Sequence, residues 1–138
     1  VRITDGLETV LIGENGDLSS PAPSVQALVE GYNKAQVFLN TSTFSPIPSV
    51  LLEAMACGCA VVSTATCMIP EVIEHGVNGM MSNDEGELRG YIDQLLGDEE
   101  LRTRLGEEAR KTIVTKFSEE NFINNWNNIF DKAYEVSK

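Results

Sequence analysis

The clearest hydrophobic pattern in this chain lies near its middle, where two short apolar runs flank a helical segment. The runs QVFL at residues 36–39 and CAVV at residues 59–62 are typical of parallel strands buried on both faces. Between them, residues 49–57 are rich in Leu, Ala, Met and Glu, which favour a helix. Pro48 suits the start of that helix and Gly58 its end. The pattern therefore predicts a strand, a helix and a second strand in direct succession.

Further elements are predicted on both sides of this central unit. The run TVLI at residues 9–12 is a strand candidate that ends in the turn-rich GENGD, and apolar residues recur at helical spacing over residues 23–35. After the second central strand we expect a short helix at residues 70–74 and a brief strand at residues 79–81. Alternating strands and helices favour a parallel sheet with helices on both faces. The fold class predicted is therefore α/β.

From residue 83 onward the pattern is helical. Asp84, Asp98 and Ser118 are candidate N-caps, and acidic residues follow the last two. Apolar residues line one face of the middle helix and one stripe of the last helix, and such stripes usually pack into a core. The first set is Leu101, Leu105, Ala109 and Ile113, and the second is Phe122, Trp126, Ile129, Phe130 and Ala133.

The central helix starts directly from a tight loop, residues 41–48, at the end of a strand. Its first turn presents the backbone N–H groups of Ser49, Val50 and Leu51, with the positive end of the helix dipole behind them, and this arrangement favours an anion. Glu53 lies about one turn further along, and its side chain leans back toward the helix start. Because phosphate repels a carboxylate, the natural partner of Glu53 is the hydroxyl pair of a ribose. Together these features predict a nucleotide site.

A second loop, residues 64–69, follows the second central strand. The carboxyl ends of parallel strands meet at one edge of a sheet, where ligands bind. We therefore expect this loop beside residues 41–48. His75, in the run HGVNG, is expected to be a turn or helix-end residue without a catalytic role.

The runs PSVLLEAMACGCAVV and IPEVIEHGVNGMM, with NKAQVFLNTS ahead of them, resemble the donor-binding domain of retaining glycosyltransferases of family four. The resemblance covers most of the chain from Tyr32 onward. It implies a Rossmann-like three-layer half of a GT-B fold with a helical C-terminus. In that family an Arg and Lys pair follows the first strand of the domain and clasps the diphosphate. No such pair precedes Thr9, so residues 1–138 are expected to form a single, truncated nucleotide-sugar-binding domain that is inactive alone.

The resemblance also implies roles for individual residues. The family motif is Glu, seven residues, Glu: the second Glu holds the ribose, the first lies against the donor sugar, and backbone amides between them meet the diphosphate. Glu53 matches the second Glu, whereas Ser45 stands at the first position and Pro46 at the position of the glycine that usually follows it. A serine can hydrogen-bond a sugar hydroxyl, but it has no charge to stabilise a developing cation. The substrate-binding residues expected are Ser45, Ile47, Pro48, Ser49, Val50 and Glu53, and the catalytic residues are not assigned.

Two functions stay open on this basis. The first is the donor-binding part of a glycosyltransferase in glycan biosynthesis, which moves a sugar from a nucleotide diphosphate sugar to a glycan or lipid acceptor with retention. The second is a degenerate, non-catalytic nucleotide-sugar-binding or assembly module. The family's terminal helices run back toward an amino-terminal acceptor domain, which this chain lacks. We therefore expect part of the surface of Phe122, Trp126 and Phe130 to be exposed or to mediate self-association.

Composition limits which partners and which cellular compartment are expected. The 138 residues are 42% hydrophobic, enough for one core, and the net charge of −11 argues against nucleic acid and anionic lipid as partners. Only Arg2 and Lys34 precede Arg89, so the predicted phosphate site has little cationic help within the sequence. Three cysteines give no disulfide framework and no zinc spacing, which favours packing thiols in a reducing cytoplasm. No cofactor, metal, signal peptide or membrane span is expected, and the full-length protein is expected to be cytoplasmic or peripheral at the membrane.

Overall fold

The structure is a computed structural model that describes residues 3–12 and 20–137. The predicted helices and the two central strands are present, with small shifts of their bounds. In chain order the elements are α1 (Val25–Lys34), β1 (Val37–Asn40), α2 (Ser49–Ala56), β2 (Ala60–Ser63), α3 (Ile69–Val72), β3 (Met80–Met81), α4 (Glu85–Gly97), α5 (Glu99–Lys116) and α6 (Glu119–Val136).

The three strands form one parallel sheet in the order β1-β2-β3. Strand β1 pairs with β2 so that Val37 lies opposite Ala60 and Leu39 opposite Val62, and β3 continues the sheet with Met80 opposite Val62. The central strand β2 is buried along its whole length, as its apolar sequence indicates. The parallel pairing predicted for the two central runs is confirmed.

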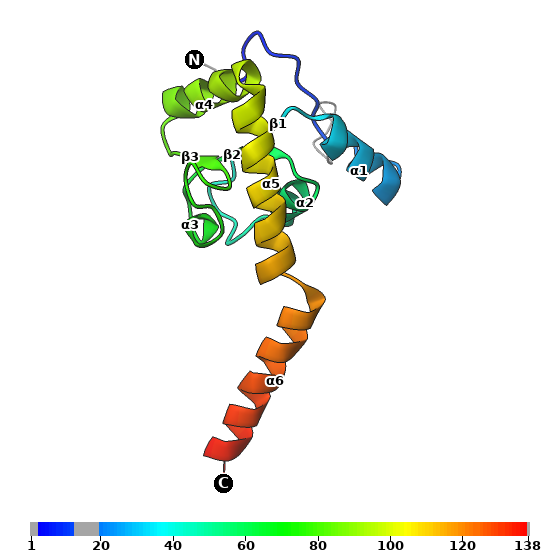
Figure 1. The fold of residues 1–138 in the computed structure, drawn as a ribbon, viewed down its shortest axis with the longest axis vertical. Helices are drawn as coiled ribbons and strands as arrows, with labels where there is room; N and C mark the ends of the chain where they lie inside the picture. Colours follow the sequence, from blue (N-terminus) through cyan, green and yellow to red (C-terminus); the bar gives the residue numbers. More distant parts are fainter. Residues whose placement is uncertain (1–2, 13–19, 138) are drawn as a thin grey trace.

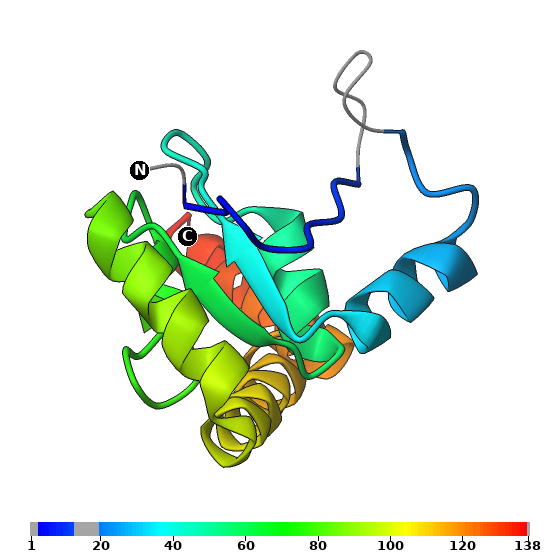
Figure 2. The same ribbon diagram turned by 90° about the horizontal axis from the view of Figure 1, so that it is seen from above.

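Helices cover both faces of the sheet, as Figure 2 shows for α2 on one side and α4 on the other. Successive side chains of β2 point to opposite faces, so that Val61 packs beneath α2 and α3 while Ala60 and Val62 pack beneath α4. Helix α5 contributes to both layers, with Ala109 in the first and Leu105 in the second. The predicted three-layer α/β arrangement is confirmed.

The strand predicted at residues 9–12 is wrong. Val10 and Leu11 are 78% and 58% exposed, and Ile12 makes only an isolated bridge with Ser20. A short β-rich run forms a strand only when a sheet edge pairs with it, and this segment does not join the described sheet. The predicted GENGD turn, residues 13–17, lies outside the described residues.

Side-chain caps fix the ends of the long helices. Asp84 accepts a hydrogen bond from the Glu87 N–H at 2.9 Å, and Asp98 accepts one from the Leu101 N–H at 2.9 Å. Ser118 accepts likewise from the backbone of α6 at 3.2 Å. All three predicted N-caps are confirmed.

The apolar stripe of α6 is not part of the core of the described chain. Helix α6 extends away from the sheet (Figure 1) and contains no buried residue, and Trp126 and Phe130 are 45% and 61% exposed. The core expectation for this stripe is therefore wrong, and the expectation of an exposed surface is confirmed. The stripe of α5 behaves as predicted, because Leu105 and Ala109 are buried. None of the helices within residues 3–12 and 20–137 has the length and apolarity needed to cross a bilayer.

Candidate functional site

The candidate site lies at the carboxyl edge of the sheet, where β1 and β2 end. Asn40, the last residue of β1, is buried, and its side-chain amide donates to the Ser63 Oγ at 2.8 Å. The Thr64 N–H donates to the Asn40 carbonyl at 3.1 Å. These bonds join the two strand ends, so the loops that follow them leave the sheet side by side.

The two loops are also bonded to each other. The carbonyl of Ser42 accepts hydrogen bonds from the hydroxyls of Thr64 at 2.6 Å and Thr66 at 2.7 Å. The Met68 N–H donates to the Pro46 carbonyl at 3.1 Å. The prediction that both loops emerge from the same edge is confirmed, and these three bonds hold the segment that leads into α2.

The start of α2 leaves two backbone donors free. Pro48 is the N-cap residue and supplies no side-chain hydrogen bond. The Leu51 N–H donates to the Pro48 carbonyl at 3.0 Å in a tight first turn, so the expectation that Leu51 offers a free donor is wrong. Among the hydrogen bonds of the described residues, none uses the N–H of Ser49 or Val50, and both residues are exposed. These two N–H groups, with the helix dipole behind them, can donate hydrogen bonds to an anion.

Glu53 has a partner that the sequence did not reveal. Tyr32, on α1, donates its hydroxyl to the Glu53 Oε2 at 2.9 Å and lies 3.5 Å from the Val50 carbonyl oxygen. Burial, with the Glu53 carboxylate second, raises the pKa of Tyr32, so the phenol stays protonated and remains a donor. Tyr32 belongs to the apolar stripe of α1, and nothing in its spacing from Glu53 indicates that the two residues meet.

The six predicted site residues divide by exposure. Pro48 is buried and Ile47 is half-buried against the core beneath α2, so both also support the loop. Ser45 is half-buried in the same loop. The other three, Ser49, Val50 and Glu53, are exposed along the first turns of α2. Their contacts with a ligand stay predictions.

The remaining candidates for chemistry have structural roles. His75 accepts the Met81 N–H on its Nδ1 at 3.0 Å and lies against the Tyr91 ring, which fixes β3. All three cysteines are free: Cys59 is buried, which raises the pKa of its thiol to about 11, and Cys57 is half-buried. Cys67 is exposed, so the prediction of a packing thiol is wrong for this residue. The part of the chain that the structure describes contains no cluster of three or more His, Cys, Asp or Glu residues that could hold a metal ion.

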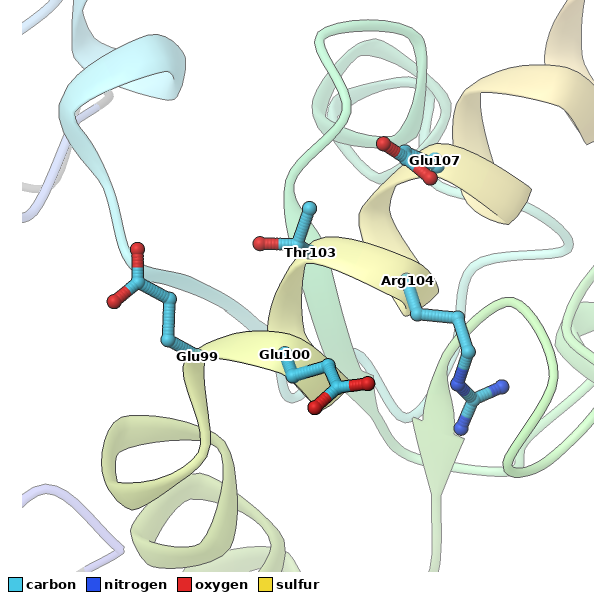
Figure 3. Close-up of a pocket in the computed structure, with 5 residues that line it drawn as sticks. All are labelled: Glu99, Glu100, Thr103, Arg104 and Glu107. Carbon is cyan, nitrogen blue, oxygen red and sulfur yellow. The ribbon is translucent and has the colours of Figure 1, made fainter.

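A surface hollow of about 500 Å³ lies elsewhere, along the first turns of α5 (Figure 3). Its lining consists of Glu99, Glu100, Thr103, Arg104 and Glu107. Three carboxylates against one guanidinium make it unfavourable for a diphosphate. None of the predicted site residues lines this hollow, so it gives no alternative location for the nucleotide.

A parallel α/β domain of this build binds its ligands beyond the carboxyl ends of its strands, where the free donors of α2 lie. Residues 12–112 match the family described as glycosyl transferases group 1, and the chain belongs to this family. It is 42% identical over 84 residues to N-acetyl-alpha-D-glucosaminyl L-malate synthase of Bacillus anthracis, which covers 59% of the chain. It is 39% identical over 87 residues, 61% of the chain, to the lipopolysaccharide core biosynthesis glycosyltransferase LpsE of Rhizobium meliloti. These matches span 22% and 25% of the two relatives.

Solved structures show the same fold. Anabaena HepE in complex with UDP superposes with a TM-score of 0.72 at 24% identity, covering 83% of this chain and 31% of that chain. Sucrose-phosphate synthase of Thermosynechococcus elongatus superposes with a TM-score of 0.73 at 22% identity, covering 88% of this chain and 31% of the synthase. The C-terminal domain of LpcC from Francisella tularensis, a glycosyl transferase group 1 protein, superposes with a TM-score of 0.64 at 21% identity. This match covers 75% of this chain and 56% of the LpcC domain. The predicted fold class, α/β with a parallel sheet and a helical C-terminus as in GT-B glycosyltransferases, is confirmed.

Proposed function

We propose that this chain is the donor-binding part of a retaining glycosyltransferase of family four, which uses a nucleotide diphosphate sugar in glycan biosynthesis. The observation that carries the proposal is the start of α2, where the free N–H groups of Ser49 and Val50 stand one turn from the carboxylate of Glu53. The names of the relatives support it, since one matched sequence is named a synthase and the other a glycosyltransferase. HepE, a relative in fold, has been solved with UDP and with UDP-glucose.

In this proposal each group binds the part of the donor that suits its charge. The two N–H groups and the helix dipole hold the diphosphate, and the Glu53 carboxylate accepts the two ribose hydroxyls. Ser45 contributes a hydroxyl to the donor sugar. The proposed acceptor is a glycan or a lipid, and none of the six predicted site residues is assigned to it.

A degenerate binding or assembly module is the second candidate. The names of the relatives do not favour it, and it rests on one observation. Ser45 occupies the position of the first motif Glu and carries no charge to stabilise a cation that develops on the donor sugar. A module that binds a nucleotide sugar without transferring it would keep Glu53 and the start of α2. Binding therefore supports both candidates, and sugar transfer separates them.

The test is a titration of the full-length protein with uridine, guanosine and adenosine diphosphates and their sugars, in EDTA. We expect saturable one-to-one binding of at least one nucleotide by calorimetry. We expect transfer from the matching donor to retain the anomeric configuration, as read by NMR of the product. Binding without transfer would favour the module, and the absence of binding across the panel would contradict both.

We also propose self-association of this chain through α6. Residues 122–130 read FINNWNNIF, the same in both directions about Trp126. Two copies of α6 that pair antiparallel about Trp126 would therefore place Phe122 against Phe130 and Glu120 opposite Lys132, twice by symmetry. The stripe is exposed along its length and no described element covers it.

For the 138-residue chain, sedimentation equilibrium is expected to give a concentration-dependent dimer. Trp126→Glu is expected to be monomeric, because it puts two carboxylates at the centre of the pair. Val114→Glu, at an exposed position of α5, is the matched control and should leave the dimer intact. A monomer at all concentrations would contradict this proposal. For the full-length protein we propose a cytoplasmic location, with peripheral attachment to the membrane as an open alternative.

A further inference from the structure

We infer that Tyr32 is a positioning residue of the proposed nucleotide site, whose hydroxyl fixes the Glu53 carboxylate in the orientation that accepts the ribose. This inference rests on the proposed function, because it assigns Tyr32 a task only if Glu53 meets a ribose. The contact that carries it is the 2.9 Å hydrogen bond from the Tyr32 hydroxyl to the Glu53 Oε2.

Tyr32 is well placed to hold a carboxylate still. It is 7% exposed, and its ring packs edge-on against Phe38 with centroids 5.9 Å apart. Its backbone carbonyl accepts hydrogen bonds from the Cys59 Sγ at 3.1 Å and the Ala35 N–H at 3.2 Å. Glu53, by contrast, is exposed, and its carboxylate has no other hydrogen bond among the described residues. The buried, packed Tyr32 therefore determines the orientation of the exposed Glu53 carboxylate.

A neutral donor suits this task better than a cation would. The raised pKa of Tyr32 keeps the hydroxyl protonated, and it contributes no positive charge that would reduce the negative charge of Glu53. A carboxylate has about four lone-pair positions, and Tyr32 occupies one of them. The others stay available for the two ribose hydroxyls, and the carboxylate loses less rotational freedom on binding because it is already held.

A purely structural role for this bond is the alternative. The bond joins α1 to α2, so its loss could lower stability without any effect on ligand binding. Stability alone cannot distinguish the two roles, whereas a ligand that lacks the ribose hydroxyls can. Such a ligand keeps the diphosphate and the base but offers Glu53 nothing to accept.

The experiment is a calorimetric titration of the full-length protein and its Tyr32→Phe variant. The ligands are the tightest binder among UDP, GDP and ADP, and its 2′,3′-dideoxy form. Phenylalanine keeps the ring that packs on Phe38 and removes only the hydroxyl. We expect Tyr32→Phe to weaken the ribonucleotide about three- to tenfold and to leave the dideoxy nucleotide unchanged. In the Glu53→Ala background, Tyr32→Phe should have no further effect on binding.

Tyr91→Phe is the matched control, since it removes a phenol hydroxyl from α4 on the opposite face of the sheet. It should leave both affinities unchanged. An equal loss for the ribonucleotide and the dideoxy form, or no loss for either, would overturn the inference for Tyr32. If Glu53→Ala itself leaves ribonucleotide affinity intact, the proposed nucleotide site fails instead, so the two failures are distinguishable.

Discussion

Replacing Glu53 by alanine is expected to weaken nucleoside diphosphate binding by about 30- to 1000-fold, because two charge-assisted hydrogen bonds to the ribose, about 2–4 kcal/mol, are lost. Calorimetric titration of the full-length protein with uridine, guanosine and adenosine diphosphates measures this effect. The fold should survive, since Glu53 is exposed and the Tyr32 hydroxyl that bonds to it also lies 3.5 Å from the Val50 carbonyl oxygen, which can still accept from it. A stability loss of about 1 kcal/mol is expected from the Tyr32 hydroxyl that loses its acceptor.

Two control variants sharpen this prediction. Glu53→Gln keeps the shape and still offers an oxygen to Tyr32, but without charge it should weaken the ribose contact less than alanine does. Glu71→Ala removes an exposed carboxylate from α3 and should leave nucleotide affinity unchanged. If wild type and Glu53→Ala bind all three diphosphates equally, Glu53 serves only the helix start, and the nucleotide site proposed at α2 is wrong.

Gly106→Ala is expected to destabilise the domain by about 1–3 kcal/mol or more, although alanine is the better helix former. A Cβ atom at Gly106 would lie 2.2 Å from the carbonyl oxygen of Gly58 and 3.1 Å from its carbonyl carbon. The turn cannot easily yield, because Gly58 has a φ of 78° and joins α2 to β2. Helix α5 would have to move away from the sheet, and the buried Leu105 and Ala109 would move with it.

Gly90→Ala is the matched control for this substitution. Gly90 lies inside α4, and a Cβ atom there would meet nothing within 4 Å. This variant should stabilise the domain by up to about 1 kcal/mol, as expected for an exposed helical glycine. Urea unfolding of the two variants beside the wild type provides the comparison. Equal stability of Gly106→Ala and Gly90→Ala would show that α5 does not pack on the Gly58 turn as described.

Much of the fold could be predicted from local sequence alone. The apolar run at residues 59–62 predicts a strand buried on both faces, and β2 is such a strand. Asp84, Asp98 and Ser118 predict helix starts because their side chains bond to backbone donors a few residues ahead. These signals succeed because each depends on neighbours in the chain. The run TVLI carries a similar signal at residues 9–12 and fails, since a strand also needs a paired edge.

In the candidate site, too, some features follow from local sequence and others depend on contacts between distant residues. The start of α2, Glu53 on its second turn and the loop before it are encoded within a few residues, so the sequence places them on one element. The use of the Leu51 N–H within the first turn depends on the geometry that the loop imposes, and periodicity gives no indication of it. The same holds for the bonds from Thr64 and Thr66 to the Ser42 carbonyl, which join two loops from different strands.

By itself, the sequence determined the helix and strand elements around residues 36–63, the parallel class of the sheet and the helix start that carries the candidate site, because all of these follow from short-range periodicity and capping. Only the tertiary structure decided that Tyr32 meets Glu53, that Gly106 packs on Gly58, and that the α6 stripe stays exposed. Those outcomes depend on which surfaces α1, α5 and α6 present to distant parts of the chain. An apolar stripe has the same sequence pattern whether another surface covers it or water does.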